Sequence, residues 1–483
     1  MSGEVAMTDR LSALDVSFLY LESPTTPMHV GGVLIFEAPE AGFDYDRLVR
    51  LIRARIAFVP RYRQRVRWVP GRLSNPVWVD DETFDVTYHV RRSALPRPGT
   101  QAQLLELVGR IMSRPLDLKR PLWEMYLVEG LEGGRFAILT KSHHAMVDGV
   151  SAVDIGQVIL DPTPEPRQTS ASPWRPAQEP SDLELLAGAV SDLVRSPASA
   201  LDMVRSGVAD ISASALRIAQ HAGGVVNAAL SVARPAASSP LNADIGVSRR
   251  LAVAQTDLAD YKAIRTAHGG TVNDVVLAVV AGGLRQWLQS RGEVLTGRST
   301  VRAMVPVSVR TEDEASGGNR VAAFFVDLPV GEASPVLRLQ RISYEMAQNK
   351  ESGQMMGAQA LVALAGFSPP TLHSLGARVG NGLSRRVFNT VVTNVPGPQV
   401  PLYAGGAHLV AAYPVVPLGA GQAVSFGITS YEGQVFFGLN ADRDAMYDVD
   451  DLADDLVAAL AELRATVVNR APRRRSGARR STG

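Results

Sequence analysis

The spacing of apolar residues in the first half of the chain predicts both helices and strands. Residues 43–57 and 101–111 carry apolar side chains three and four positions apart, as on one face of a helix. Residues 124–129 and 135–141 are short apolar runs, and a Glu-Gly-Gly turn sequence at 132–134 separates them. We therefore expect two strands that are joined as a hairpin.

A second mixed region begins near residue 248. Helical spacing covers residues 258–268 and 274–288, and Thr271 or Asn273 is a suitable N-cap for the second of these helices. The runs typical of strands are residues 301–309, 321–328, 390–395, 423–430 and 434–440, with a hairpin turn at 431–433. A closing amphipathic helix is expected at 449–467, because Leu452, Leu456, Leu460 and Leu463 keep to one side.

The segment between these regions has a different character. Prolines are too frequent from Asp161 to Pro180 for a helix or a strand. The apolar stretch that follows, residues 183–232, has helical spacing, with one face formed by Leu183, Leu186, Val190, Leu193 and Val194 and another by Leu201, Val204 and Val208. It is interpreted as an ordinary pair of packing helices, a lipid-surface segment or a partner-binding helix.

These patterns predict an α+β fold with two mixed domains of similar size. Such a division also follows from the length, because 483 residues exceed one ordinary core. The predicted limits are 1–160 for the N-terminal domain, 161–245 for the linker and helical connector, 246–469 for the C-terminal domain, and 470–483 for an arginine-rich tail. The tail carries six arginines and no acid, so we expect disorder, and either simple solvation or attraction to anionic lipid.

Composition narrows the function classes. The net charge is +1, so no whole-chain field attracts nucleic acid. The absence of cysteine excludes a disulfide framework and an acyl-cysteine intermediate. The N-terminus has no signal-peptide character, and no run approaches the ~20 apolar residues of a membrane span. We expect a cytoplasmic protein whose contact with membranes or lipid droplets is peripheral.

The strongest chemical signal is a pair of adjacent histidines, His143 and His144, followed by Asp148 and Gly149. They come directly after the predicted strand 135–141. An imidazole at the end of a strand is held rigidly and can take a proton near neutral pH, since its ordinary pKa is about 6.5. The sequence therefore predicts a general base.

Three other interpretations of the histidine pair were weighed. A histidine beside a strand is often a hydrogen-bonded core residue. A metal site is disfavoured, because zinc usually needs three or four protein ligands and the remaining six histidines are scattered singly. A serine hydrolase is disfavoured because the chain contains no GxSxG elbow.

His143-His144-xxx-Asp148-Gly149 resembles the HHxxxDG motif of the bacterial wax ester synthase/diacylglycerol acyltransferase family. That family belongs to the chloramphenicol-acetyltransferase-like superfamily, as do peptide-synthetase condensation domains. Four further stretches are similar to signatures of this family: Leu14-Asp15-xx-Phe18 with Pro27-Met28-His29-Val30-Gly31-Gly32, Pro121-Leu122-Trp123, Val272-Asn273-Asp274-Val275, and Asn394-Val395-Pro396-Gly397-Pro398. The resemblance implies two chloramphenicol-acetyltransferase-like mixed α/β domains with the active site in a tunnel between them.

The resemblance also implies the chemistry. The family transfers a long-chain acyl group from acyl-CoA to diacylglycerol, with no cofactor beyond the acyl-CoA co-substrate. His144 is then the proton acceptor and His143 a supporting neighbour. Asp148 is structural and paired with an arginine, for which Arg63 is the first choice. Gly149 offers a backbone N–H to the oxyanion or is only a turn residue.

The remaining signatures carry two interpretations each. Asn273 and Asp274 border the substrate tunnel, or they are a helix cap and a first-turn acid. Pro121 and Trp123 form a tunnel wall, although a packing role is favoured. The competing functions are a wax ester synthase acting on fatty alcohols, a condensation-type enzyme acting on carrier-protein thioesters, and a lipid-binding protein without enzymatic activity.

Overall fold

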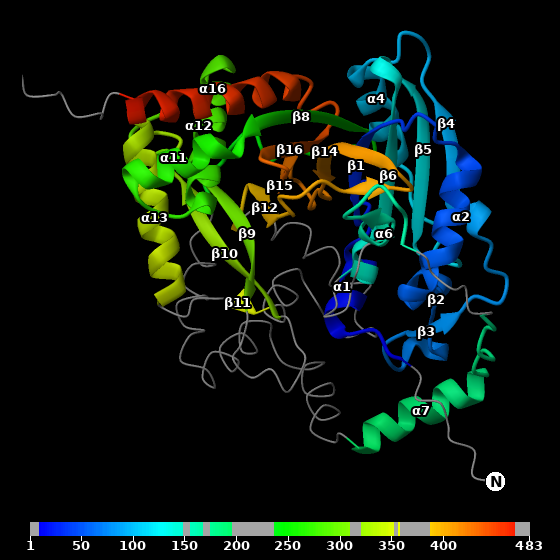
Figure 1. Cartoon of the computed structure of the whole chain (residues 1–483). Coiled ribbons are helices and arrows are strands. Elements are labelled where there is room, and N and C mark those ends of the chain that lie inside the picture. The colour runs from blue at the N-terminus through cyan, green and yellow to red at the C-terminus, as the bar shows by residue number, and fades with distance from the viewer. Residues whose placement is uncertain are drawn as a thin grey trace, which may run out of the picture.

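The computed structural model describes residues 9–147, 155–167, 174–195, 236–309, 320–351, 356–357 and 387–468. Two seven-stranded sheets, each with its own helices, stand beside one another (Figure 1). The α+β prediction is confirmed. The first sheet has the order β4 (Val90–Ala94), β5 (Trp123–Leu131), β6 (Arg135–His143), β1 (His29–Glu37), β14 (Ala407–Val415), β13 (Tyr403–Ala404) and β7 (Leu160–Asp161).

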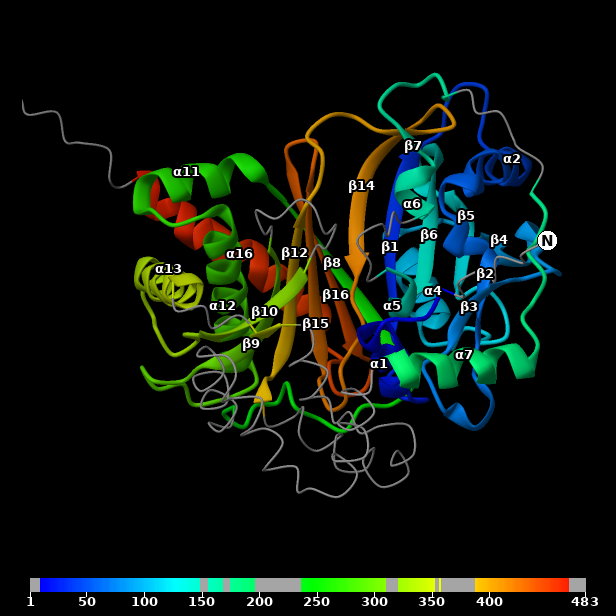
Figure 2. The ribbon, with the colours of Figure 1, turned by 90° about the horizontal axis from the view of Figure 1, so that it is seen from below.

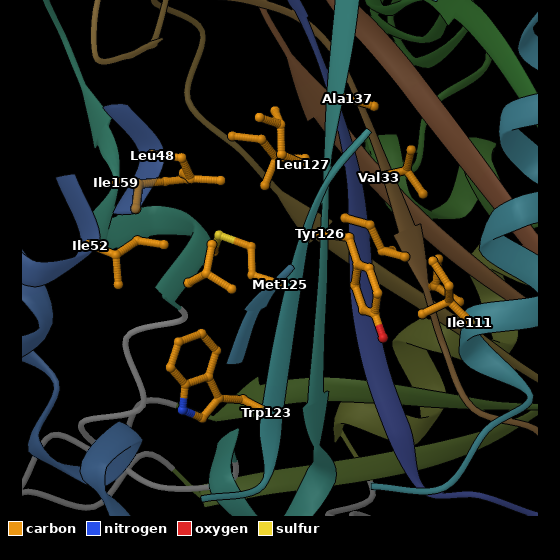
Figure 3. Packing of buried hydrophobic residues seen from close by; sticks show 14 of the residues in the cluster. Val33, Leu48, Ile52, Ile111, Trp123, Met125, Tyr126, Leu127, Ala137 and Ile159 are labelled. Atoms are coloured by element: carbon orange, nitrogen blue, oxygen red, sulfur yellow. The ribbon is translucent and has the colours of Figure 1, made fainter. Parts of the chain in front are cut away.

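Helices flank the first sheet on both faces. They are α1 (Ala13–Leu21), α2 (Tyr45–Arg55), α3 (Val86–His89), α4 (Gln101–Met112), α5 (His144–Val147) and α6 (Ile155–Val158). The predicted helices near 43–57 and 101–111 are confirmed as α2 and α4, and the predicted hairpin as β5 and β6. Their core is a continuous apolar cluster in which Ile52, Met125 and Ile159 pack together (Figure 3).

In the described part of the chain, the helices of the second sheet lie in one layer on one of its faces, as Figure 2 shows. Its order is β11 (Met356–Gly357), β10 (Arg320–Leu328), β9 (Val301–Val309), β12 (Thr390–Pro396), β15 (Val424–Tyr431), β16 (Gln434–Asp442) and β8 (Arg249–Asp257). The helices are α11 (Leu258–His268), α12 (Val272–Ser290), α13 (Pro335–Glu351) and α16 (Val449–Val468). The four predicted leucines of α16 are buried, and the β15–β16 turn has positive φ at Glu432 and Gly433, as a tight hairpin requires.

One strand links the two sheets. β14 comes from the C-terminal half of the sequence but pairs with β1 in the first sheet. Pro414 of β14 also lies against β15 and β16, where Gly427 and Gly438 are directly opposite each other. A Cβ at Gly427 would lie 2.9 Å from the Pro414 Cβ, and one at Gly438 would overlap the Pro414 carbonyl oxygen. The sheets therefore approach closely only because both positions are glycine.

The domain limits 1–160 and 246–469 stay a prediction. The first sheet does not follow them, because it contains β13 and β14 from the C-terminal part of the sequence. The short strands β7 and β13 pair with each other at the edge of the first sheet, so residue 161 lies within that sheet rather than at the start of a free linker. Buried Arg55 of α2 contacts the Asp161 carboxylate at 2.5 Å. Of the segment 150–160, only α6 and its flanks are described, and residues 148–154, 196–235 and 469–483 lie outside the described part of the chain.

Helix α7 (Asp182–Arg195) is confirmed as a helix, but its predicted inner face is wrong in part. It packs against a two-stranded sheet of β2 (Gln64–Arg67) and β3 (Val77–Asp80). Leu185 and Ala189 of the helix contact Val77 and Val79 of β3 and the nearby Val69. Leu183 and Val190, which were assigned to one packing face, are 79% and 58% exposed. In the described residues, no helix is long and apolar enough to cross a membrane.

The glycine pair under β14 gives a first prediction. Gly438→Ala should lower the free energy of unfolding by about 2 kcal/mol or more, because the added methyl group meets backbone that cannot give way. Gly297→Ala is the matched control, since a Cβ at Gly297 meets nothing within 4 Å. Urea unfolding of the two variants measures the difference. Equal stabilities would contradict a close contact at Pro414.

Candidate active site

The two adjacent histidines occupy different environments because the strand ends between them. His143 is the last residue of β6 and is fully buried, whereas His144 opens α5 and is partly exposed. Their backbones are held from two sides: the His143 N–H donates to the Leu122 carbonyl at 2.9 Å, and the His144 N–H donates to the Met28 carbonyl at 2.8 Å. Of the two histidines, only His144 is therefore partly accessible to solvent.

His143 belongs to a buried cluster with Glu22 and His29. His29 of β1 is the direct cross-strand partner of His143, and their ring centroids are 6.2 Å apart. The Glu22 carboxylate spans both rings, at 3.3 Å from His29 Nε2 and 3.5 Å from His143 Nε2. The Ala145 N–H donates to His143 Nδ1 at 3.1 Å, so the ring proton of neutral His143 lies on Nε2, toward Glu22.

Burial and these contacts shift the protonation of the cluster. Burial alone would raise the pKa of Glu22, but interactions with His143 and His29 outweigh it and lower this pKa to about 2. Burial lowers the pKa of His29 more than Glu22 raises it. The carboxylate is therefore ionised and His29 neutral at pH 7. Neither residue was identified as a site residue from the sequence, where His29 was counted among the scattered histidines.

A buried lysine supports the same strand. Lys141 precedes His143 by two residues, so both side chains lie on the face of the sheet that α4 covers. Its Nζ donates to the carbonyls of Ile111 at 3.1 Å and Arg114 at 2.5 Å, at the end of α4, and lies 3.7 Å from the Glu124 carboxylate. Burial lowers the pKa of Lys141 to about 8, although Glu124 opposes the shift. The ammonium group ties α4 to the histidine strand.

His144 is oriented by the N-terminal signature. Its ring stacks on Phe18 of α1, with centroids 4.0 Å apart and an interplanar angle of 19°. Helix α1 starts with a capping box in which Ser12 and Asp15 bond each other's backbone N–H groups. Phe18 and Met28, which the sequence connects to the histidines only through the family resemblance, thus contact His144 directly.

The Pro121-Leu122-Trp123 stretch is buried where β5 begins. Trp123 is fully buried among Ile52, Met125 and their neighbours (Figure 3). Its indole N–H donates to the Tyr62 carbonyl at 2.8 Å, and its ring stacks on His89 at 4.7 Å. A role of Pro121 and Trp123 as tunnel wall stays a prediction.

The two signatures of the second half meet each other. The Asn394 amide of β12 donates to Asn273 Oδ1 of α12 at 3.0 Å. Thr271, not Asn273, is the N-cap of α12, and buried Asp274 accepts from the Thr271 N–H at 2.8 Å in a capping box. Asp274 is thus a first-turn acid, as the alternative to a tunnel role predicts, whereas Asn273 is not the cap. Asn273 instead joins the helix start to the strand end.

Arg63 faces the linker. Its guanidinium lies 4.5 Å from the centre of the Trp174 ring, and burial lowers its pKa while Asp80 raises it. Asp148 and Gly149 lie outside the described residues, so the Arg63–Asp148 pair and the oxyanion role of Gly149 stay predictions. Among the described residues, no group of three or more His, Asp or Glu side chains is arranged to hold a metal ion.

Comparison with known protein families identifies the family to which these signatures belong. The family model described as "Wax ester synthase/diacylglycerol acyltransferase catalytic domain" matches residues 11–276, and the family's C-terminal domain model matches residues 317–464. The chain belongs to the wax ester synthase/diacylglycerol acyltransferase family. The resemblance inferred from the sequence motifs is therefore confirmed.

Relatives of this family align over most of the chain. A protein of Mycobacterium tuberculosis named as a probable diacylglycerol O-acyltransferase, tgs2, is 36% identical over 466 residues, which is 95% of this chain and 99% of that protein. The wax ester synthase/diacylglycerol acyltransferase structure from Marinobacter aquaeolei VT8 is 30% identical, with a TM-score of 0.69 over 95% of this chain and all of that chain.

More distant structures share the fold alone. The first condensation domain of the calcium-dependent antibiotic synthetase is 17% identical, with a TM-score of 0.57, and covers 97% of this chain and 98% of that one. Together with the Marinobacter structure, this likeness confirms the expected chloramphenicol-acetyltransferase-like fold.

The buried cluster predicts a pH dependence of stability. In the unfolded chain His29 takes up a proton near pH 6.5, whereas in the folded protein its pKa is lower. Acidification from pH 7 to pH 5 therefore favours the unfolded state. His29→Gln lacks this penalty, so the stability advantage of the unsubstituted protein over the variant should shrink between pH 7 and pH 5. Chemical denaturation at both pH values measures it, and an advantage that stays constant or grows would refute the assignment.

Proposed function

We propose that the protein is an acyl-CoA-dependent diacylglycerol O-acyltransferase that makes triacylglycerol, with His144 as general base. The observation that carries the proposal is the difference between the environments of the two adjacent histidines. His143 is locked in a buried cluster with Glu22, while His144 is partly exposed, stacked on Phe18 and anchored through its backbone to Met28. The mycobacterial relatives named for this activity support the choice of acceptor.

The reaction needs no covalent intermediate. His144 takes the proton from the acceptor hydroxyl as its oxygen attacks the thioester carbonyl of acyl-CoA. The tetrahedral oxyanion collapses, the carbon–sulfur bond breaks and the CoA thiolate leaves, taking the proton from His144. In this scheme Gly149 supplies an N–H to the oxyanion, and Asp148 with Arg63 holds the loop. The chain has no cysteine that would carry an acyl group.

Wax ester synthesis is the second candidate. The Marinobacter relative is named for both activities, and the two reactions differ only in the acceptor alcohol. We propose that Asn273 from the second half and Pro121 from the first border the tunnel, whereas Asp274 belongs to the capping box of α12 and the Trp123 ring is buried against His89. An apolar tunnel separates acceptors weakly, since one methylene is worth ~1–3 kcal/mol.

Replacement of the base tests the mechanism. His144→Ala should lower turnover by roughly 10²- to 10⁴-fold, the usual contribution of a general base, while leaving the fold intact. His143→Ala should slow the folded enzyme less. His408→Ala, at a partly exposed histidine on β14, is the matched control and should keep full activity. The assay uses radiolabelled acyl-CoA with diacylglycerol, a fatty alcohol and an amine.

Each outcome of that panel has a consequence. Near-normal transfer by His144→Ala rules out the mechanism. If the enzyme prefers the fatty alcohol, it is a wax ester synthase and not a diacylglycerol acyltransferase. If it prefers the amine, it catalyses a condensation reaction. An unsubstituted protein that transfers to none of the three is a binding protein and not an acyltransferase.

We also propose peripheral contact with a membrane or lipid-droplet surface, where the acceptor is found. Leu183 and Val190 project from α7 into solvent, and the tail beyond Asn469 carries only basic charges. Leu183→Gln with Val190→Gln should weaken binding to anionic phospholipid vesicles. Glu184→Gln, at an exposed position outside the face that Leu183 and Val190 share, should not weaken it. Truncation after Asn469 should remove the salt-sensitive part of binding and preserve transfer to detergent-dispersed diacylglycerol. Vesicle sedimentation at low and high salt measures both, and unchanged binding by both variants would contradict the contact.

A further inference from the structure

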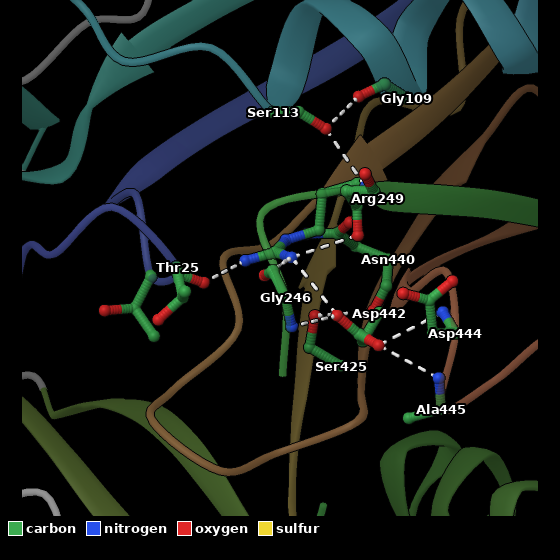
Figure 4. Close-up of polar contacts among 12 residues, drawn as sticks. Thr25, Gly109, Ser113, Gly246, Arg249, Ser425, Asn440, Asp442, Asp444 and Ala445 are labelled. Atoms are coloured by element: carbon green, nitrogen blue, oxygen red, sulfur yellow. Dashed lines mark hydrogen bonds and ion pairs between the residues drawn. The ribbon is translucent and has the colours of Figure 1, made fainter. Parts of the chain in front are cut away.

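Arg249 connects the two halves of the molecule at the turn between α1 and β1. It is the first residue of β8 in the second sheet, and its side chain is almost completely buried. The guanidinium donates to the carbonyl of Thr25, which lies in the first half between α1 and β1. It also donates to the carbonyls of Gly246, at 2.8 Å, and Ser248, at 3.1 Å (Figure 4). One side chain thus forms hydrogen bonds with the backbone of both halves.

Asp442 fixes the position of this arginine. Its carboxylate is 3.7 Å from the guanidinium and accepts N–H groups from Gly246 at 2.7 Å, Ala445 at 2.9 Å and Asp444 at 3.1 Å. The carboxylate is therefore held by rigid backbone rather than by the arginine alone. Because the ion pair is long, the buried charge of Arg249 is stabilised mainly by carbonyl groups, and the Thr25 carbonyl is one of three.

The Thr25 carbonyl belongs to a short rigid turn that reaches both histidines. Ser23 and Thr26 exchange backbone hydrogen bonds of 3.3 and 3.0 Å, and their hydroxyl groups are 2.6 Å apart. At one end of this turn Glu22 contacts His143. At the other end Met28 accepts the His144 N–H. A displacement of the turn would therefore move the groups that hold the histidine pair.

A second route runs through the backbone of Arg249. Its N–H donates to Ser113 Oγ at 3.0 Å, and the Ser113 hydroxyl donates to the Gly109 carbonyl at 2.7 Å (Figure 4). Gly109 allows this approach, because a Cβ there would lie 2.7 Å from the Arg249 carbonyl oxygen. Lys141 ties the same end of α4 to the histidine strand. The first route thus ends at His143 and His144, and the second ends at Lys141, two residues before His143 on the same strand.

We propose that Arg249 is a positioning residue for His144: it fixes the turn at residues 22–28 to the second half, so that the base keeps its alignment with a substrate held between the halves. This inference rests on the proposed acyltransferase function. It is distinct from that function, because acyl transfer by the unsubstituted protein tests the function and the response to changes at Arg249 tests the positioning.

The experiment compares Arg249→Met with Arg250→Met in the full-length protein. Arg250 is the next residue and forms an exposed ion pair with Asp450, so it is a matched loss of one arginine. Arg249→Met should lower kcat by roughly 10- to 100-fold with KM changed less than about threefold, because small misplacements of a reacting group reduce kcat strongly. Arg250→Met should leave both constants unchanged. All assays are run well below the unfolding midpoint of each variant.

Two further readouts separate positioning from general destabilisation. In protein labelled with ¹⁵N-histidine, the Nε2–H form of His143 should be lost or averaged in Arg249→Met and kept in Arg250→Met. Arg249→Lys keeps the cation but reaches fewer carbonyls, so its kcat should lie between those of the other proteins. If Arg249→Met does not fold, Arg249→Lys carries the test. Unchanged kcat and an unchanged His143 signal in the folded variants would overturn the proposal, as would a loss of kcat that only matches the unfolded fraction.

Discussion

The structure depends on strand β14, which belongs to the first sheet and lies directly against the second. β14 completes the first sheet by pairing with β1 and at the same point presses Pro414 onto Gly427 and Gly438 of the second sheet. Since β1 pairs in turn with β6, the contact at Pro414 sets the distance from the second sheet to the strand that ends at His143. Side chains at the two glycines would separate the sheets. The distance between the two halves is thus set by backbone contact.

The cluster behind His144 has features of a functional site rather than of a core. His29, His143 and Lys141 are ionisable groups in the interior, and the Glu22 carboxylate beside them is mostly buried; the loss of their hydration costs stability. The cluster fixes the ring of His143 and the end of β6 in one arrangement. We interpret the lost stability as the consequence of holding His144 rigidly while its ring remains accessible.

Local patterns in the sequence predicted the elements whose signal is local. The hairpin β5–β6, helices α2, α4, α11, α12 and α16, and the hairpin β15–β16 follow from apolar spacing and turn residues. The strands β1, β8 and β14 and the helices α1 and α13 were not predicted. β1 contains two adjacent glycines, of which Gly31 packs closely against the Thr140 carbonyl, and β14 takes its place only through partners distant in sequence. On α7 the spacing gave the helix but not its buried side.

The part of the site that has a local sequence signature was predictable, and the rest was not. The adjacent histidines and the following aspartate and glycine were visible as a motif, and His144 was chosen through the family resemblance. Glu22 and Arg249 were missed, because a lone carboxylate or arginine has no local signature. Their roles arise from contacts across 121 positions for Glu22 and His143, and across 224 for Arg249 and Thr25. Recognising Glu22 would have required the pairing of β1 with β6, in which His29 faces His143.

The central claim is direct acyl transfer under general-base catalysis by His144. A rapid-quench, single-turnover reaction with radiolabelled acyl-CoA and diacylglycerol tests it most directly. The account predicts that triacylglycerol appears at the rate at which acyl-CoA disappears, that no label is attached to protein at any time, and that His144→Ala slows both processes equally. A burst of free CoA before triacylglycerol appears, or an acyl group bound covalently to the protein, would contradict it.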